Sequence, residues 1–112
     1  MALSKEIVDK VYEAIEVAKN TGKIRKGANE VTKILEKGEA KLVAFAGDTS
    51  PKEIIMHLSV LSQEKGVTCV EVPSKTDLGA SAGLEVGTTA VAIILEGEAK
   101  NLISEIIAKS KQ

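Results

Sequence analysis

The stretch that decides the fold is Lys41-Leu-Val-Ala-Phe-Ala46, a short apolar run that comes just before Gly47. Such a run is typical of a buried β-strand. On its N-terminal side, residues 29–37 carry apolar side chains at helical spacing and stop at Gly38. Residues 51–66 show the same spacing on its C-terminal side. A buried strand between two amphipathic helices indicates a sheet covered by helices.

The alternation of helix and strand patterns continues toward both ends of the chain. The further segments that we predict are helices over 5–20, 74–83 and 97–109, and extended stretches over 23–26, 68–72 and 89–95. This order predicts an α/β fold, a three-layer α/β/α sandwich with a small mixed central sheet.

Helix starts are marked by serines. Ser4 can cap the first helix. Ser50 with Glu53, and Ser74 with Asp77, have the spacing of a capping box. The polar residues 108–112 are predicted to fray.

Length and composition favour a single domain over residues 1–112. Hydrophobic residues make up 44% of the chain, which is enough for one core with little surplus. The longest apolar run, Ala90–Leu95, is too short to span a bilayer, and no signal-like segment opens the chain. We therefore expect a soluble cytoplasmic protein without a membrane partner. The two aromatic residues, Tyr12 and Phe45, are too few for a platform of stacked bases.

The chain shows no pattern typical of an enzyme. Cys69 and His57 are the only residues of their kinds and cannot supply the four ligands of a zinc site, so no metal or cofactor is expected. His57 has no identifiable nucleophile beside it, and is predicted to be structural or on the surface. Cys69 is predicted to act as a small hydrophobe in the middle of a strand. Gly79-Ala-Ser-Ala-Gly83 lacks the spacing of a dinucleotide-binding loop.

The positive charge is concentrated in one segment. Residues 19–41 hold seven basic and three acidic residues, a net +4, whereas the formal net charge of the whole chain is −1. This segment is a candidate surface for a polyanion. The alternative is a solvated face whose lysines serve solubility.

The start of the second helix carries side chains suited to reading a base edge. Gly27 precedes a polar first turn that contains Asn29 and Glu30. An amide offers a donor and an acceptor, and a carboxylate offers two acceptors that match adjacent N–H groups of guanine. The lysines around this pair, which could hold a phosphate backbone, are Lys26, Lys33 and Lys37. The alternative is that Asn29 caps the helix and Glu30 complements its dipole.

The segment Lys26-Gly-Ala-Asn-Glu-Val-Thr-Lys33 resembles the signature of the kink-turn RNA-binding protein family, most closely the archaeal large-subunit ribosomal protein "seven Ae". Further stretches agree in the expected order, so the resemblance covers nearly the whole chain. They are Ala40–Ala46 with Asp48, Pro51–Leu58, and Ser74–Gly79 leading to Gly83–Val86.

The resemblance implies roles for individual residues. It implies that Asn29 and Glu30 contact the sheared G·A pairs of a kink-turn and that Lys33 contacts nucleotides there. It also implies that the backbone of Lys26 and Gly27 contacts phosphate.

A second group of roles concerns a nucleotide that is flipped out of the stack. The resemblance implies that Ile54 and Lys75 help to hold it and that the loop Leu84-Glu85-Val86 packs over its base. Leu84 could instead be an ordinary loop residue tucked against the core. Glu85-Val86 is similar to archaeal rather than eukaryotic members. Gly87 replaces the Pro or Ala of many relatives, so the RNA preference of the loop could differ.

The function that follows from the resemblance is non-enzymatic RNA binding. Relatives act in the large ribosomal subunit, in box C/D and H/ACA guide particles and in ribonuclease P. The expected partners are therefore ribosomal and guide RNAs and proteins of these ribonucleoproteins, with the chain a monomer apart from RNA. The alternative function is a protein-interaction module of the same fold that lacks kink-turn binding.

Overall fold

A four-stranded sheet lies at the centre of this computed structural model, which describes residues 4–110. Its order is β1-β4-β2-β3. The strands are β1 (Lys23–Lys26), β2 (Leu42–Ala46), β3 (Cys69–Val72) and β4 (Ala90–Leu95). β2 pairs with β3 in parallel, whereas β4 is antiparallel to both β1 and β2. The sheet is therefore mixed, as predicted.

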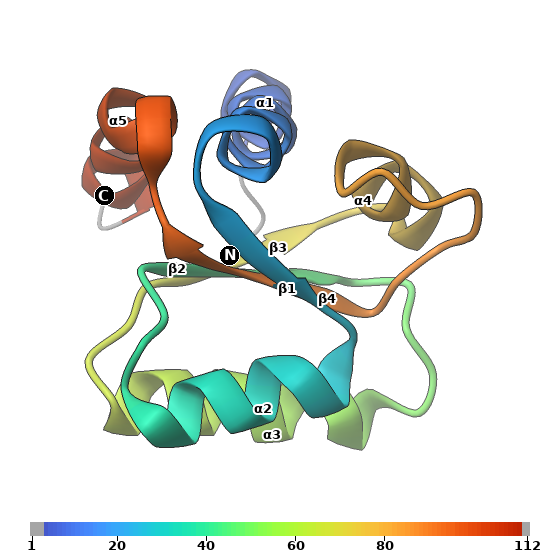
Figure 1. Cartoon of the computed structure of the whole chain (residues 1–112). Helices are drawn as coiled ribbons and strands as arrows, with labels where there is room; N and C mark the ends of the chain where they lie inside the picture. The colour runs from blue at the N-terminus through green and yellow to red at the C-terminus, as the bar shows by residue number, and fades with distance from the viewer. Residues whose placement is uncertain (1–3, 111–112) are drawn as a thin grey trace.

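Helices cover both faces of the sheet, which confirms the predicted three layers (Figure 1). The helices on one face are α1 (Lys5–Thr21), α4 (Lys75–Ser81) and α5 (Lys100–Ser110), and those on the other are α2 (Ala28–Lys37) and α3 (Lys52–Glu64). A single 3₁₀ turn, η1 (Gly97–Ala99), precedes α5, so the helix predicted from residue 97 begins as a tighter turn. None of the helices over residues 4–110 is long and apolar enough to cross a membrane.

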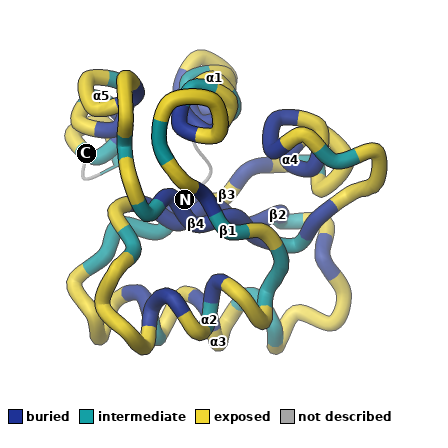
Figure 2. The backbone as a smooth tube through the Cα atoms, in the orientation of Figure 1, coloured by how far each residue is buried: buried dark blue, intermediate teal, exposed yellow. Residues whose placement is uncertain are grey.

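Each face of the sheet has its own apolar core. All five residues of β2 are buried, because the strand has helices on both sides, and Figure 2 shows the burial along the strands. One core joins the sheet to α1, α4 and α5, with Val11, Leu78 and Ile106 fully buried. The other joins it to α2 and α3, with Leu35 and Leu58 fully buried.

The predicted helix caps are right at two serines and wrong at the third. Ser4 Oγ accepts from the Ile7 N–H at 3.3 Å, and Ser74 Oγ accepts from the Asp77 N–H at 3.2 Å. The capping box at Ser50 does not form, because the cap position of α3 is taken by Pro51, whose side chain has no acceptor.

The predicted fraying of the C-terminal residues is corrected in part. Residues 108–110 belong to α5, and Ser110 Oγ donates to the Ile107 carbonyl at 2.9 Å. Residues 111 and 112 lie outside the described residues. Cys69, predicted in mid-strand, is the first residue of β3 and is half-buried.

Strand direction gathers the predicted binding segments at one end of the sheet. β1 and β2 both run antiparallel to β4, and β3 runs parallel to β2. The segments that follow β1, β2 and β3 therefore emerge beside the segment that enters β4, at the right of Figure 1. The predicted site residues at this end come from the start of α2, the start of α3, the start of α4 and the loop before β4.

Candidate nucleic-acid interface

The start of α2 is shaped by a glycine rather than by a capping side chain. Gly27 is the N-cap residue, with φ +96°, a conformation that residues with a Cβ rarely adopt. Its N–H donates to the Ala90 carbonyl at 2.8 Å, and its carbonyl accepts from the Val31 N–H at 2.9 Å. No side chain caps the helix, so the alternative in which Asn29 is the cap is wrong.

The two polar side chains of this first turn are exposed, and so is Lys33. Lys33 Nζ lies 3.5 Å from Glu30 Oε1, with the side chains 64% and 48% exposed. An ion pair this exposed contributes little to stability, about 0 to 1 kcal/mol. The Glu30 carboxylate therefore remains available to an external donor at small cost. Lys26, which precedes this turn, and Lys37, the last residue of α2, are also exposed.

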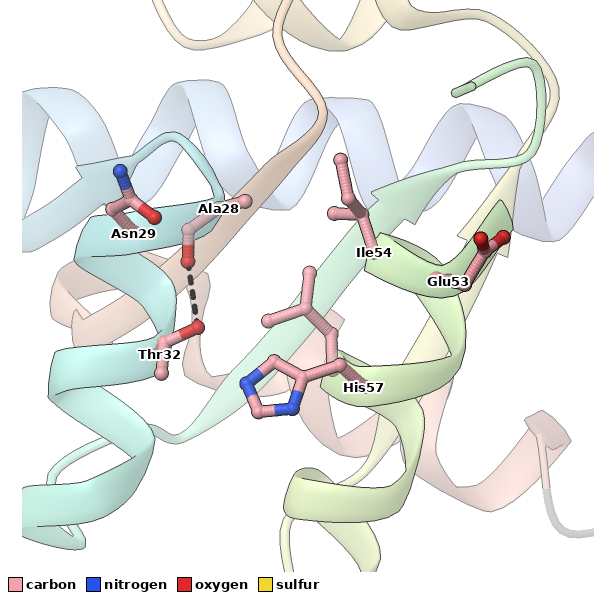
Figure 3. Close-up of a pocket in the computed structure, with 7 residues that line it drawn as sticks. Ala28, Asn29, Thr32, Glu53, Ile54 and His57 are labelled. Carbon is pink, nitrogen blue, oxygen red and sulfur yellow. Dashed lines mark hydrogen bonds between the residues drawn. The ribbon is translucent and has the colours of Figure 1, made fainter. Parts of the chain in front are cut away.

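A cavity of about 370 Å³ lies between α2 and α3 (Figure 3). Its lining residues are Ala28, Asn29 and Thr32 from α2, and Glu53, Ile54, His57 and Leu58 from α3. Two predicted site residues, Asn29 and Ile54, thus border one space. Thr32 Oγ1 donates to the Ala28 carbonyl at 2.8 Å, so its hydroxyl is engaged by its own helix. His57 is exposed, as predicted for a surface histidine, but its place at this cavity was not predicted.

The remaining predicted residues lie around the start of α4. Lys75 is its first residue and is exposed. The Leu84 N–H donates to the Gly79 carbonyl at 2.8 Å, which holds the loop on α4. Leu84 is half-buried, Glu85 is exposed, and Val86 is 70% exposed. An apolar side chain this exposed is available for contact with a ligand.

Two comparisons identify relatives. Residues 9–103 match the ribosomal protein L7Ae/L30e/S12e/Gadd45 family. The chain belongs to this family. A solved structure of the 15.5kD RNA binding protein of Giardia lamblia is similar, with a TM-score of 0.92 and 30% sequence identity over 98% of this chain and 92% of that one. The family and fold inferred from the sequence are therefore confirmed, and so is the non-enzymatic class.

In this L7Ae/L30e/S12e/Gadd45 family member, three residues to which the sequence assigned no role contact the predicted site residues. They are Asp48, Thr88 and Gly79. Asp48 Oδ1 accepts from the Lys75 N–H at 3.0 Å, and the Thr88 N–H donates to the Lys75 carbonyl at 3.0 Å. A Cβ on Gly79 would lie 2.1 Å from the Val86 carbonyl oxygen, so glycine is required there. These contacts join residues far apart in the chain and leave no local pattern. Asp48 and Gly79 had a signal, because both belong to stretches that resemble the family, whereas Thr88 had none.

Two titratable groups away from the predicted site of this family member have raised pKa values. Burial raises the pKa of the Cys69 thiol to about 11, so the thiol is neutral near pH 7 and behaves as the predicted small hydrophobe. Burial also raises the pKa of Tyr12, with a smaller contribution from Asp77. Over residues 4–110, no three His, Cys, Asp or Glu side chains cluster closely enough to hold a metal ion.

Proposed function

We propose that this protein binds RNA and that its ligand is the kink-turn, with tandem sheared G·A pairs. One observation carries the proposal: the amide of Asn29 and the carboxylate of Glu30 are exposed in the first turn of a helix that begins without a side-chain cap. Family membership and the similar RNA binding protein support the same class of ligand.

In the proposed complex, the first turn of α2 enters the groove beside the bend. Glu30 accepts hydrogen bonds from adjacent N–H groups of a guanine, and Asn29 donates to and accepts from a neighbouring purine. Lys33 exchanges its ion pair with Glu30 for base or phosphate acceptors. The exchange costs little, because the pair is exposed in the free protein.

The phosphate contacts come from the ends of β1 and α2. The exposed N-terminus of α2 carries a partial positive charge, and the backbone of Lys26 and Gly27 lies directly before it. The Gly27 N–H is held by the Ala90 carbonyl, so the N–H groups of the first turn of α2 are the donors proposed for phosphate. Lys26, at the end of β1, and Lys37, at the end of α2, add full positive charges. Because the cations are few, the proposed RNA affinity has a modest salt dependence.

The proposed pocket for an extruded nucleotide lies between the starts of α3 and α4. Ile54 gives it an apolar wall, and Lys75 a cation for the adjacent phosphate. The loop Leu84-Glu85-Val86 covers the base, because an unstacked base needs apolar surface and Val86 is largely exposed. The negative charge of Glu85, at the edge of the proposed pocket, repels phosphate. The RNA backbone is therefore kept on the side of Lys75.

The proposed mechanism is a shift of population. A free kink-turn samples open and bent forms, and a protein that binds only the bent form stabilises it by the difference in affinity. We propose that the chain is one domain over residues 1–112, a cytoplasmic monomer that presents bent RNA to partner proteins. Its particles would be the archaeal large ribosomal subunit, box C/D and H/ACA particles and ribonuclease P, with any catalysis performed by the partners.

Crosslinking with sequencing of the bound RNAs tests the substrate. The expected result is enrichment of RNAs with tandem sheared G·A pairs next to a bend. Titration with a synthetic kink-turn, beside a control in which both G·A pairs become G·C pairs, then measures the preference directly. Equal affinity for the two RNAs would contradict kink-turn recognition while leaving general RNA binding intact.

The alternative is a protein-interaction module that has lost kink-turn binding. Met56 and Val60, one turn apart on α3, are 64% and 56% exposed, so this part of the helix offers apolar surface to a partner. Substitution of Glu30 by Ala discriminates the two functions. In the first case it severely weakens kink-turn binding with little change in melting temperature, and in the second case the wild type and the variant bind RNA equally.

A further inference from the structure

The backbone of Lys75 joins three segments that are distant in the sequence. Its N–H donates to Asp48 Oδ1 at 3.0 Å, in the loop that leads from β2 to α3. Its carbonyl accepts from the Thr88 N–H at 3.0 Å, in the loop that enters β4. The first residue of α4 is therefore bonded on both sides, and the two loops are held at a fixed spacing.

Close packing makes the loop before β4 follow any movement of α4. A Cβ on Gly79 would lie 2.1 Å from the Val86 carbonyl oxygen, and one on Gly87 would lie 3.1 Å from Lys75 Cγ. The backbone of residues 86 and 87 thus rests directly on the helix. A shift of the start of α4 would carry Val86 with it.

The hydrogen bond that Asp48 accepts from Lys75 is not needed to cap α4. Ser74 already caps this helix through the Asp77 N–H, at 3.2 Å. The Asp48 carboxylate comes from 27 residues away and takes a different N–H, that of Lys75. A hydrogen bond from a backbone N–H to a carboxylate is stronger than one between neutral groups. Asp48 therefore ties the start of α3, which carries Ile54, to the start of α4.

We propose that Asp48 is a positioning residue that sets the gap between Ile54 and the 84–86 loop, so that one unpaired nucleobase fits between them. This inference rests on the proposed function and assigns Asp48 a part in it. Asp48 acts through the Lys75 backbone and makes no contact with RNA. Its effect is therefore confined to the contribution that the extruded base makes to affinity.

The test measures affinity for two RNAs, a kink-turn and the same RNA with an abasic site at its unpaired nucleotide. We expect Asp48→Ala to weaken binding of the first RNA by about tenfold, the size of one hydrogen bond to a charged group. Affinity for the abasic RNA should stay at the wild-type value. Asp48→Asn, whose amide oxygen can still accept, should retain most of the base-dependent affinity.

Two further variants make the result specific. Glu64→Ala removes the same charge from an exposed position at the end of α3 and should change neither affinity. Gly79→Ala pushes the loop off α4 without touching Asp48, and should reproduce the selective loss. Circular dichroism melting checks that each variant is folded.

The inference and the proposed function fail in different ways. An equal loss on both RNAs from Asp48→Ala would show that the residue only supports the fold. A wild-type protein that binds the two RNAs equally would exclude the base pocket and leave kink-turn recognition standing. A wild-type protein that binds neither RNA would overturn the proposed function, and this inference with it.

Discussion

Helices α1 and α2 lie on opposite faces of the sheet and use their polar residues in opposite ways. α1 is capped by Ser4, and Lys10 in its second turn pairs with Glu105 of α5 and with Glu6. α2 begins at Gly27 with no side-chain cap, and its first turn exposes an amide and a carboxylate. The difference is that α1 uses its polar side chains within the fold, whereas α2 leaves those of its first turn exposed, with one weak ion pair to Lys33.

The largest expected effect comes from the exposed carboxylate of α2. Glu30→Ala should weaken kink-turn binding by about 2 to 5 kcal/mol, because it removes one partner of a charge-assisted contact in a desolvated site. The melting temperature should stay close to that of the wild type, since the exposed pair with Lys33 contributes little. Isothermal titration and thermal melting measure the two effects. Glu36→Ala, also exposed on α2, is the matched control, and an equal loss from it would contradict the assignment.

The corresponding change in α1 should affect stability and not binding. Ser4→Ala removes the cap that accepts the Ile7 N–H, and should cost about 1 kcal/mol of unfolding free energy. Urea denaturation measures this loss. RNA affinity should be unchanged under conditions where the variant is folded. A selective loss of RNA binding from Ser4→Ala would break the contrast between the helices.

A smaller effect is expected from Lys37 on α2, with Lys10 on the opposite face of the sheet as its control. Lys37→Gln should weaken binding of all kink-turns similarly and reduce the slope of log affinity against log salt by about 1. Lys10→Gln makes the same change in charge on α1, where the lysine is paired with Glu105, and should leave the slope nearly unchanged. Titrations at several salt concentrations measure both slopes. Equal slopes for the two variants would argue against a phosphate contact at Lys37.

The last effect is absent near neutral pH and concerns the half-buried thiol on β3. Folding raises the pKa of Cys69 from 9.0 to about 11, so the folded state favours the neutral thiol. Its contribution to stability is complete below pH 9.0 and is lost as the pH rises toward about 11. Unfolding free energies of wild type and Cys69→Ala, measured across this range, should converge as the pH rises. A constant difference between the two would contradict the shift.

Much of the fold follows from the sequence because local signals agree with it. Apolar spacing places the helices and strands within a few residues, and Ser4 and Ser74 form the predicted caps. The capping box predicted at Ser50 was wrong, because the residue spacing alone does not show that Pro51 occupies the cap position. The 3₁₀ turn before α5 likewise lacks a distinct pattern of apolar spacing.

The sequence points to the candidate site where the residues concerned are contiguous in the chain. Asn29, Glu30 and their lysines form one short segment around Gly27. The cavity between α2 and α3 depends on how two helices pack, so His57 could not be assigned to it from spacing. The bond between Asp48 and Lys75 spans 27 residues and arises from the parallel pairing of β2 with β3.

The two edges of the sheet bear on how the free protein behaves in solution. β1 and β3 are the edge strands, and such strands can recruit another sheet and seed aggregation. β1 carries three cations in four residues, and β3 is equally short and is followed by Pro73. Both features discourage strand addition. Because β1 leads directly into the proposed phosphate contacts, the charges that would attract RNA also keep unbound copies of the protein apart.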